Sequence, residues 1–317
     1  MRRNSKGSAL LTALLITAIC AILATAILVN QSVIINQAEL VHNADQMYLA
    51  ASAANTWSLG QIVDHAISPD HGRSLYSNQS TMPIPAMNVG GSEVSGNIID
   101  ANSRFNINSL AQTKNQPAFT KLILAVSPDT PPKTANLIAQ SVSNWLMPTG
   151  HDEDYLKHKP PYRPGHIPMV NLTELKAVLM LNTSSPAFST DLYNRLLPML
   201  VALPNQYNKI NINGLQTAVE AAPLLYALGQ KLSLDNAKTL ASCIIASRPY
   251  QNTTELSSRC PESAQLNSGS LDVKSQYYLV NSAARLDHQQ LQMSSLIGVL
   301  RNSKNKPYFH IIWQALM

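Results

Sequence analysis

The sequence predicts an α+β fold with one long N-terminal helix and a sheet built from two separated segments, interrupted by a large inserted all-α domain. No Gly or Pro occurs from Ser8 to Leu59, so one helix can run through this stretch. Residues 82–107 and 277–313 are rich in short β-type stretches, and the segment between them carries helix-period patterns. The predicted parts are a short basic start (1–7), a long helix (8–66), a first β region (67–110), an inserted α-helical domain (111–268) and a second β region (269–317).

Length and composition favour an exported or packed subunit with two folded units. A chain of 317 residues exceeds the size at which single hydrophobic cores usually stop growing. Hydrophobic residues make up 45% of the chain and charged residues 13%, a low charge content for a solvated cytosolic enzyme. The formal net charge is +5, and loss of the three basic residues at the start would leave +2. That charge gives no basis for expecting nucleic-acid binding.

The N-terminus predicts a membrane anchor. Arg2, Arg3 and Lys6 precede an apolar run that continues to Val29, and no charge occurs between Lys6 and Glu39. About 20 apolar residues suffice to cross a bilayer. Basic residues ahead of the run hold the N-terminus in the cytoplasm and direct the rest across. We therefore expect a single-pass inner-membrane protein whose globular body lies in the periplasm.

Three interpretations of this start are a plain signal anchor, a secretory signal cleaved after Ala24-Thr25-Ala26, and a prepilin-type leader. The chain does not break into turn residues after Ala26. Apolar residues instead recur at three- and four-residue spacing, at Ile34, Ala38, Val41, Ala44, Tyr48, Ala51, Leu59, Ile62 and Ala66. One helix from about Ser8 to Ala66 would be roughly 85 to 90 Å long. A helix of this kind suits packing against copies of itself.

A short basic leader that ends in Gly7 and leads directly into an apolar helix resembles the type IV pilin and pseudopilin signature. The resemblance implies that prepilin peptidase cuts between Gly7 and Ser8, and that Ser8 becomes the N-methylated end. Pilins generally carry Glu at mature position five, where this chain has Thr12. A carboxylate in the bilayer is costly unless it is paired, and a subunit with no predecessor would not need one. Loss of that Glu marks the K-type minor pseudopilins of the type II secretion system (general secretion pathway protein K).

Further segments resemble the same family, in collinear order. They are Gly96–Asp100 with Arg104–Leu110, Pro160–Arg163, Asn171–Leu175 and Leu271–Val280. The resemblance implies a pilin-like long helix and antiparallel sheet interrupted by a large α-domain. It also implies a place at the tip of the pseudopilus, where the subunit would initiate assembly with I- and J-type minor pseudopilins. Other pseudopilins, prepilin peptidase and the inner membrane would be its further contacts, and protein export across the outer membrane its purpose.

The inserted domain shows helical patterns and cap signals of its own. Asn171 and Glu174 suit a capping box, and Ser233 suits an N-cap. Strands are expected around residues 278–280 and 309–313. The helices are expected near residues 117–126, 133–146, 172–181, 190–200, 215–228, 235–247 and 254–258.

The densest acidic cluster, His151–Tyr155, follows Pro148-Thr149-Gly150 in a predicted loop. Calcium takes six to eight oxygen ligands, for which carboxylates on a bent loop are suited. The corresponding loop in K-type pseudopilins is more acidic and binds calcium in some members. The resemblance implies Asp152, Glu153, Asp154 and Glu174 as candidate ligands, with Asn144 able to complete a site. The alternative is a solvated acidic turn, because few ligands are visible.

The cysteines predict one disulfide. Cys20 lies inside the apolar stretch, whereas Cys243 and Cys260 lie far downstream in the polar body. In an oxidising compartment, a bond between Cys243 and Cys260 would contribute roughly 3 kcal/mol on the chain-entropy model. The alternative is two separately buried thiols. Zinc is disfavoured because no CxxC pair or spaced histidines accompany them.

No catalytic role is predicted. The sequence contains no GxSxG elbow, phosphate loop, HExxH helix or dinucleotide fingerprint. Its eight histidines and three cysteines are scattered without a triad-like grouping. We expect a building block of an assembly and assign no catalytic residue.

The rival hypothesis is a membrane-anchored DNA-binding protein. Residues 210–215, 234–247 and 249–256 resemble helix-hairpin-helix repeats, whose Gly-containing hairpin brings backbone amides to a phosphate. Here the turn reads Gly229-Gln230-Lys231-Leu232-Ser233-Leu234, without the Gly-Ile-Gly hairpin. Lys231, Lys238 and Arg248 are the nearby bases, too few to neutralise several phosphates. No nucleic-acid partner is therefore expected.

Overall fold

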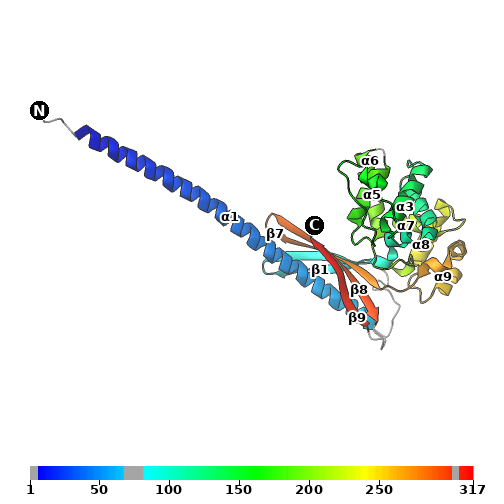
Figure 1. The fold of residues 1–317 in the computed structure, drawn as a ribbon. Coiled ribbons are helices and arrows are strands. Elements are labelled where there is room, and N and C mark those ends of the chain that lie inside the picture. Colours follow the sequence, from blue (N-terminus) through cyan, green and yellow to red (C-terminus); the bar gives the residue numbers. More distant parts are fainter. Residues whose placement is uncertain (1–5, 68–80, 184, 302–306, 317) are drawn as a thin grey trace.

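A computed structural model describes residues 6–67, 81–183, 185–301 and 307–316. Its first element is α1, a single helix from Lys6 to Ile67. Figure 1 shows α1 as a rod that leaves the body of the molecule, with the sheet packed along its C-terminal part and the helical block at the far end from the N-terminus. At 1.5 Å per residue the rod is about 90 Å long.

The C-terminal third of α1 packs on the sheet through small residues. Met47, Ala50, Ala51, Ala54 and Ile62 are buried there, and the alanines allow the helix backbone to approach the strands closely. Of the predicted stripe, Ala51 and Ile62 are buried against the sheet. Ile34 and Val41 are exposed because no described residue of α1 before Met47 is buried, and Tyr48 is exposed although it lies beside Met47.

The sheet has five antiparallel strands in the order β1-β2-β7-β8-β9. The β2–β7 pairing joins the segment before the helical block to the segment after it. Gly90 and Gly91, with φ of 61° and 90°, make the tight turn between β1 and β2. The predicted α+β fold class is confirmed. The strands are β1 (Thr81–Val89), β2 (Ser92–Asp100), β7 (Tyr277–Leu286), β8 (Gln289–Arg301) and β9 (Pro307–Leu316).

The helical block lies between β2 and β7 and has its own hydrophobic core. Ser233 caps α8 by accepting a hydrogen bond from the Asn236 amide, and Asn171 and Glu174 form the expected capping box. The α-helices are α2 (Gln116–Val126), α3 (Pro132–Leu146), α4 (Glu153–Leu156), α5 (Leu175–Asn182), α6 (Pro186–Leu196), α7 (Ala218–Leu228), α8 (Leu234–Ala246) and α9 (Thr253–Arg259).

Two halves of this block repeat one construction. In the first half, β3 (Phe105–Asn106) pairs in parallel with β4 (Leu200–Val201). In the second half, β5 (Ile210–Asn211) pairs in parallel with β6 (Leu271–Asp272). Each half opens with an Asn-Ile-Asn sequence whose first Asn caps a short 3-10 helix. The block is therefore two similar units side by side in the chain.

The second Asn of each sequence fastens its unit from within. Asn108 exchanges two hydrogen bonds with the backbone of Met169, at 2.8 and 2.9 Å, and donates to the Leu203 carbonyl at 2.7 Å. Asn213 exchanges two with the backbone of Tyr250, both at 2.9 Å, and donates to the Val273 carbonyl at 3.1 Å. Both asparagines are buried, so each satisfies backbone groups that water cannot reach.

The predicted β regions need a correction at their inner ends. Residues 67–110 were expected to belong to the first β region, but β2 ends at Asp100, and Phe105, Ile107 and Leu110 lie in the core of the helical block. Residues 271–272 also belong to the block, and the sheet resumes at Tyr277. Short apolar stretches around a 3-10 helix resemble strands in sequence, which explains the error. Residues 68–80 of this region lie outside the described residues.

Candidate assembly surface

The N-terminal part of α1 suits a membrane anchor. Among the described residues, one helix is long and apolar enough to cross a bilayer, and its apolar window is not buried inside the protein. Thr17 and Thr25 donate their hydroxyls to the carbonyls of Leu14 and Ala21, which satisfies these groups without water. Gly7 and Ser8 lie in the first turn of α1, and residues 1–5 of the predicted leader lie outside the described residues.

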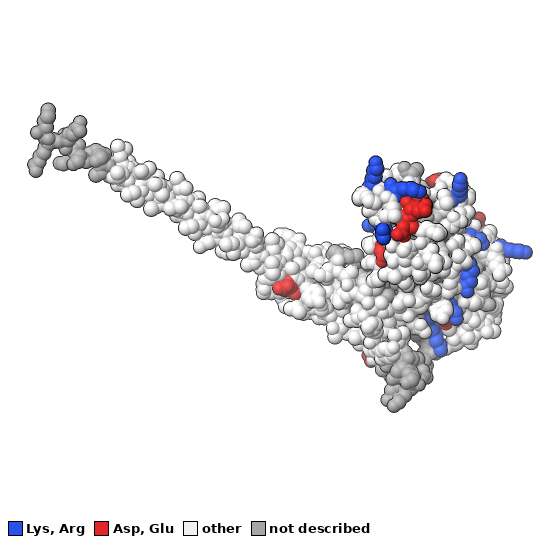
Figure 2. Space-filling view, in the orientation of Figure 1, with Lys and Arg blue, Asp and Glu red and all other residues white. Residues whose placement is uncertain are grey.

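Charge divides the molecule into two surfaces. Figure 2 shows Lys, Arg, Asp and Glu gathered over the helical block, whereas the visible faces of α1 and the sheet are nearly bare. After Lys6, the sequence of α1 contains Glu39, Asp45 and Asp64 but no Lys or Arg. Exposed apolar side chains such as Leu40 (54%) and Val41 (63%) cover the part of α1 that precedes its contact with the sheet. A long apolar surface of this kind marks an interaction site.

A buried carboxylate sits where the chain passes between sheet and helical block. Asp100 ends β2 and accepts hydrogen bonds from Asn211 Nδ2 at 2.6 Å, from the Asn102 amide at 2.9 Å and from the Ser275 hydroxyl. Asn102 in turn accepts from the amide of Tyr277 at 2.9 Å, where the chain re-enters the sheet. We call Asp100, Asn102, Asn211 and Ser275 the joint. It connects the outgoing chain, the returning chain and the second half of the block.

Burial raises the pKa of the Asp100 carboxyl to about 6, although hydrogen bonds from Ser275, Asn211 and Asn102 act to lower it. Gly214 lies against this carboxyl, and a Cβ at that position would overlap the side chain. The close approach and the three donors hold the carboxylate in one place. The joint was not predicted from the sequence, because its members come from three distant segments.

The acidic loop, residues 147–168, follows α3. Asp152 Oδ1 accepts a hydrogen bond from His166 Nε2 at 2.7 Å, and Arg163 Nε lies 4.0 Å from the other carboxylate oxygen. The hydrogen bond to Asp152 raises the pKa of His166 above its ordinary value. Asn144 holds the turn by donating to the His151 carbonyl and accepting from the His151 amide, both at 2.7 Å. The loop is thus fastened by side chains of the protein.

The structure does not bring the predicted calcium ligands together. Glu153 and Asp154 begin α4, have side chains 87% and 79% exposed, and face Lys157 at 4.0 and 3.6 Å. Glu174 belongs to the capping box. It also accepts from the Trp145 indole at 3.2 Å. Within the described residues, no three His, Cys, Asp or Glu side chains are grouped as metal ligands. The calcium site at Asp152, Glu153, Asp154 and Glu174 therefore stays a prediction, and in this structure these four side chains make other contacts.

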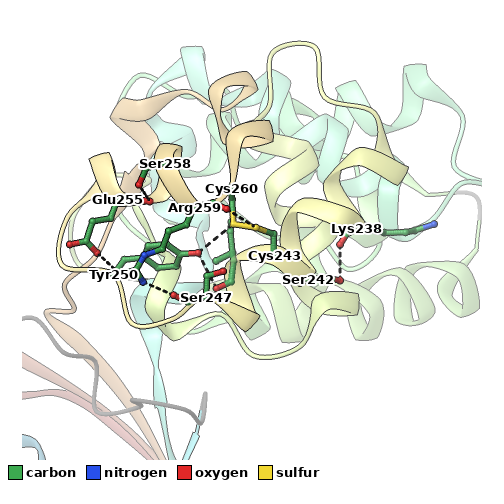
Figure 3. Close-up of a disulfide and its surroundings, with 10 residues drawn as sticks. Lys238, Ser242, Cys243, Ser247, Tyr250, Glu255, Ser258, Arg259 and Cys260 are labelled. Atoms are coloured by element: carbon green, nitrogen blue, oxygen red, sulfur yellow. Dashed lines mark hydrogen bonds and ion pairs between the residues drawn. A yellow bond between two sulfur atoms is a disulfide. The ribbon is translucent and has the colours of Figure 1, made fainter.

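Cys243 of α8 and Cys260, which follows α9, form a disulfide with their Cα atoms 6.0 Å apart. Figure 3 shows the bond beside Tyr250 and Arg259. Arg259 donates to the carbonyls of Ser247 at 2.7 Å and Pro249 at 3.1 Å, and its guanidinium stacks over the Tyr250 ring at 5.3 Å. Cys20 is a free, exposed cysteine on α1. The second half is therefore closed by a covalent bond and by Arg259.

Two of the bases that the DNA-binding hypothesis needs, Arg248 and Lys238, bind other groups of the protein. Arg248 donates to the carbonyls of Asn213 at 3.1 Å and Leu215 at 2.6 Å. Lys238 pairs with Asp235 on the same helix at 3.0 Å. A guanidinium that ties two backbone segments together is not available to a phosphate. The resemblance of this region to helix-hairpin-helix repeats therefore lies in its helices and not in groups that bind phosphate.

Comparisons with known proteins agree with this architecture. The family model described as "Type II secretion system (T2SS), protein K" matches residues 103–205, the first half of the helical block. The type II secretion system protein K of Pectobacterium carotovorum subsp. carotovorum is 27% identical, covering 94% of this chain and 93% of that protein. The Dickeya chrysanthemi protein of the same name is 30% identical, over 56% of this chain and 49% of that protein.

The chain is similar to type II secretion system protein K over almost its whole length. The fold agrees with a solved structure, the GspK-GspI-GspJ complex of the enterotoxigenic Escherichia coli type 2 secretion system. That match has a TM-score of 0.68 and 21% identity, and covers 89% of this chain and 99% of the matched chain. These similarities support a minor pseudopilin function in type II secretion and give the DNA-binding alternative no support.

Proposed function

We propose that this chain sits at the tip of the type II secretion pseudopilus and initiates its assembly with I- and J-type minor pseudopilins. One observation carries the proposal: the helical block is inserted between β2 and β7 and lies at the far end of the molecule from the membrane helix (Figure 1). Stacked within a filament, a block of this size would collide with the subunit above. At the tip nothing lies above it.

The division of charge supports the same orientation. The nearly uncharged α1 and sheet supply the surface that packs against neighbouring subunits, and the charged helical block faces solvent (Figure 2). The partners follow from the family, since the matched Escherichia coli structure is a complex of K, I and J proteins. We assign the chain a structural role and no catalytic one.

Processing and topology complete the proposal. Prepilin peptidase removes residues 1–7, Ser8 becomes the N-methylated end, and α1 holds the protein in the inner membrane with its body in the periplasm. The basic start and the apolar run of α1 support this orientation. Mass spectrometry of the mature N-terminus should find Ser8, and Gly7→Leu should leave the precursor uncut. An end at Ile27 would instead indicate ordinary signal peptidase.

Thr12→Glu tests the tip position. A repeating subunit gains from a carboxylate here because a neighbour's amine can pair with it in lipid. A tip subunit has no such neighbour, so the substitution buries a charge at a cost of at most about 2.5 to 3.5 kcal/mol. Secretion should fall or stay unchanged, and the protein should still appear once per overproduced pseudopilus. Repeated incorporation along the filament, detected by an antibody to the helical block, would refute the tip assignment.

A further inference from the structure

The acidic loop is an addition to the construction that the two halves share. In the second half, residues 247–249 connect α8 to Tyr250, the residue that Asn213 binds. In the first half, residues 147–168 connect α3 to Met169, the corresponding partner of Asn108. The shared fold therefore does not hold the acidic loop in place. The loop needs a fastening of its own.

His166 lies near the end of this loop and contacts residues at its start. Its Nδ1 lies 2.8 Å from the Met147 carbonyl at the start of the loop, and its Nε2 lies 2.7 Å from Asp152 Oδ1. Its amide donates to the Trp145 carbonyl at 2.9 Å. The residue has a φ of 51°, a left-handed conformation that costs free energy in a non-Gly residue. Gly150 lies so close that a Cβ there would overlap the His166 ring.

Both ring nitrogens of His166 face acceptors. The Met147 carbonyl cannot donate, and Asp152 meets the ring with a carboxylate oxygen. The side chain therefore joins the start of the loop to Asp152 through both ring nitrogens. Arg163 places its guanidinium 4.0 Å from the other oxygen of Asp152. Side chains of the protein thus occupy the surroundings of the carboxylate that a metal would use.

We propose that the His166 side chain is a built-in latch that orders the acidic loop in place of a bound calcium ion. The latch closes the loop over an aromatic cluster in which the Tyr155 ring lies 5.6 Å from both Trp145 and Tyr162. Calcium would have to displace His166 from Asp152 and draw Glu174 away from the Trp145 indole and the capping box. Loop order is therefore independent of calcium, a property beyond the tip role.

Limited trypsin digestion of the full chain in detergent micelles tests the latch, because Lys157, which precedes His158, is a cleavage site within the loop. His166→Ala and Asp152→Asn should each speed cleavage after Lys157 on the order of tenfold, as loss of a hydrogen bond to a carboxylate predicts. The matched controls are His151→Ala in the same loop and Asp129→Asn outside it, which change exposed side chains. Both should cleave at the rate of the unchanged protein.

The same digestion with and without calcium tests whether a bound ion orders the loop instead. Adding CaCl2 or EDTA should leave the cleavage rate of the unchanged protein the same, up to the ~1 mM range in which extracellular calcium modules bind. Protection by calcium that Asp152→Asn abolishes would overturn the proposal. So would equal cleavage of His166→Ala and His151→Ala. If His166→Ala fails to fold, Asp152→Asn against Asp129→Asn still decides, because an amide preserves the shape of the carboxylate.

Discussion

The two halves of the helical block share one frame and differ in how each is closed. In both, a buried Asn binds the backbone that follows the second helix, at Met169 in the first half and Tyr250 in the second. The short connection of the second half is reinforced by a disulfide. The long connection of the first half is held by His166 and Asp152. The same scaffold is thus closed by a disulfide in the half with the short connection, and by a side-chain hydrogen bond in the half with the long one.

The largest expected effect is on the shared frame. Asn108→Ala and Asn213→Ala each leave three buried backbone groups without their partner, at about 1 to 3 kcal/mol for each group. Each variant should lose at least about 3 kcal/mol of unfolding free energy, whereas exposed Asn236→Ala should change it by less than about 0.5 kcal/mol. Hydrogen exchange read by mass spectrometry reports each half separately. Equal loss of protection in both halves from either variant would show that they unfold as one unit.

Removal of the disulfide should affect the second half alone. Cys243→Ala with Cys260→Ala releases a loop that spans 17 residues, at a cost of roughly 3 kcal/mol. Amides of α8 and α9 should exchange faster, while those of α3 and α5 keep their protection. Urea unfolding with and without reductant gives the same comparison in the unchanged protein. Faster exchange throughout the block would contradict the separation of the halves.

The joint distinguishes the halves in a second way, because Asn211 of the second half binds Asp100 whereas Asn106 of the first half binds the backbone of Asn205 and Tyr207. The pKa of Asp100 is raised from 3.8 to about 6 in the folded protein, so the folded state holds its proton more tightly. The contribution of Asp100 to the unfolding free energy is therefore greatest below the unfolded pKa. It falls by about 2 to 3 kcal/mol as pH rises through the folded pKa of about 6.

Unfolding free energies measured from pH 4 to 6.5 test this sign. The unfolding free energy of the unchanged protein should decrease relative to that of Asp100→Asn as pH rises, because the amide does not titrate. The Asp129→Asn variant, at an exposed carboxylate, serves as the control. A difference that stays flat over this range would show that Asp100 remains ionised throughout.

The sequence predicted the helices more accurately than the contacts between them. The long helix was expected at residues 8–66 and runs from Lys6 to Ile67, since an uninterrupted apolar pattern is a local signal. The joint was missed because Asp100, Asn211 and Ser275 are distant in sequence. The calcium site stays a prediction; in this structure α4 directs Glu153 and Asp154 outward and Glu174 serves a capping box. The repeated Asn-Ile-Asn at residues 106–108 and 211–213 was the available signal of the duplication.

The smallest expected effect concerns Arg259, the noncovalent closure of the second half. Arg259→Lys keeps the charge but loses the planar group that donates to Ser247 and Pro249 while stacking over Tyr250. With the disulfide intact it should cost about 1 to 2 kcal/mol. In the background without Cys243 and Cys260 it should cost more, because the disulfide no longer holds α9 beside α8. A double-mutant cycle on urea unfolding measures that difference. Costs that simply add would mean that Arg259 and the disulfide close separate parts of the second half.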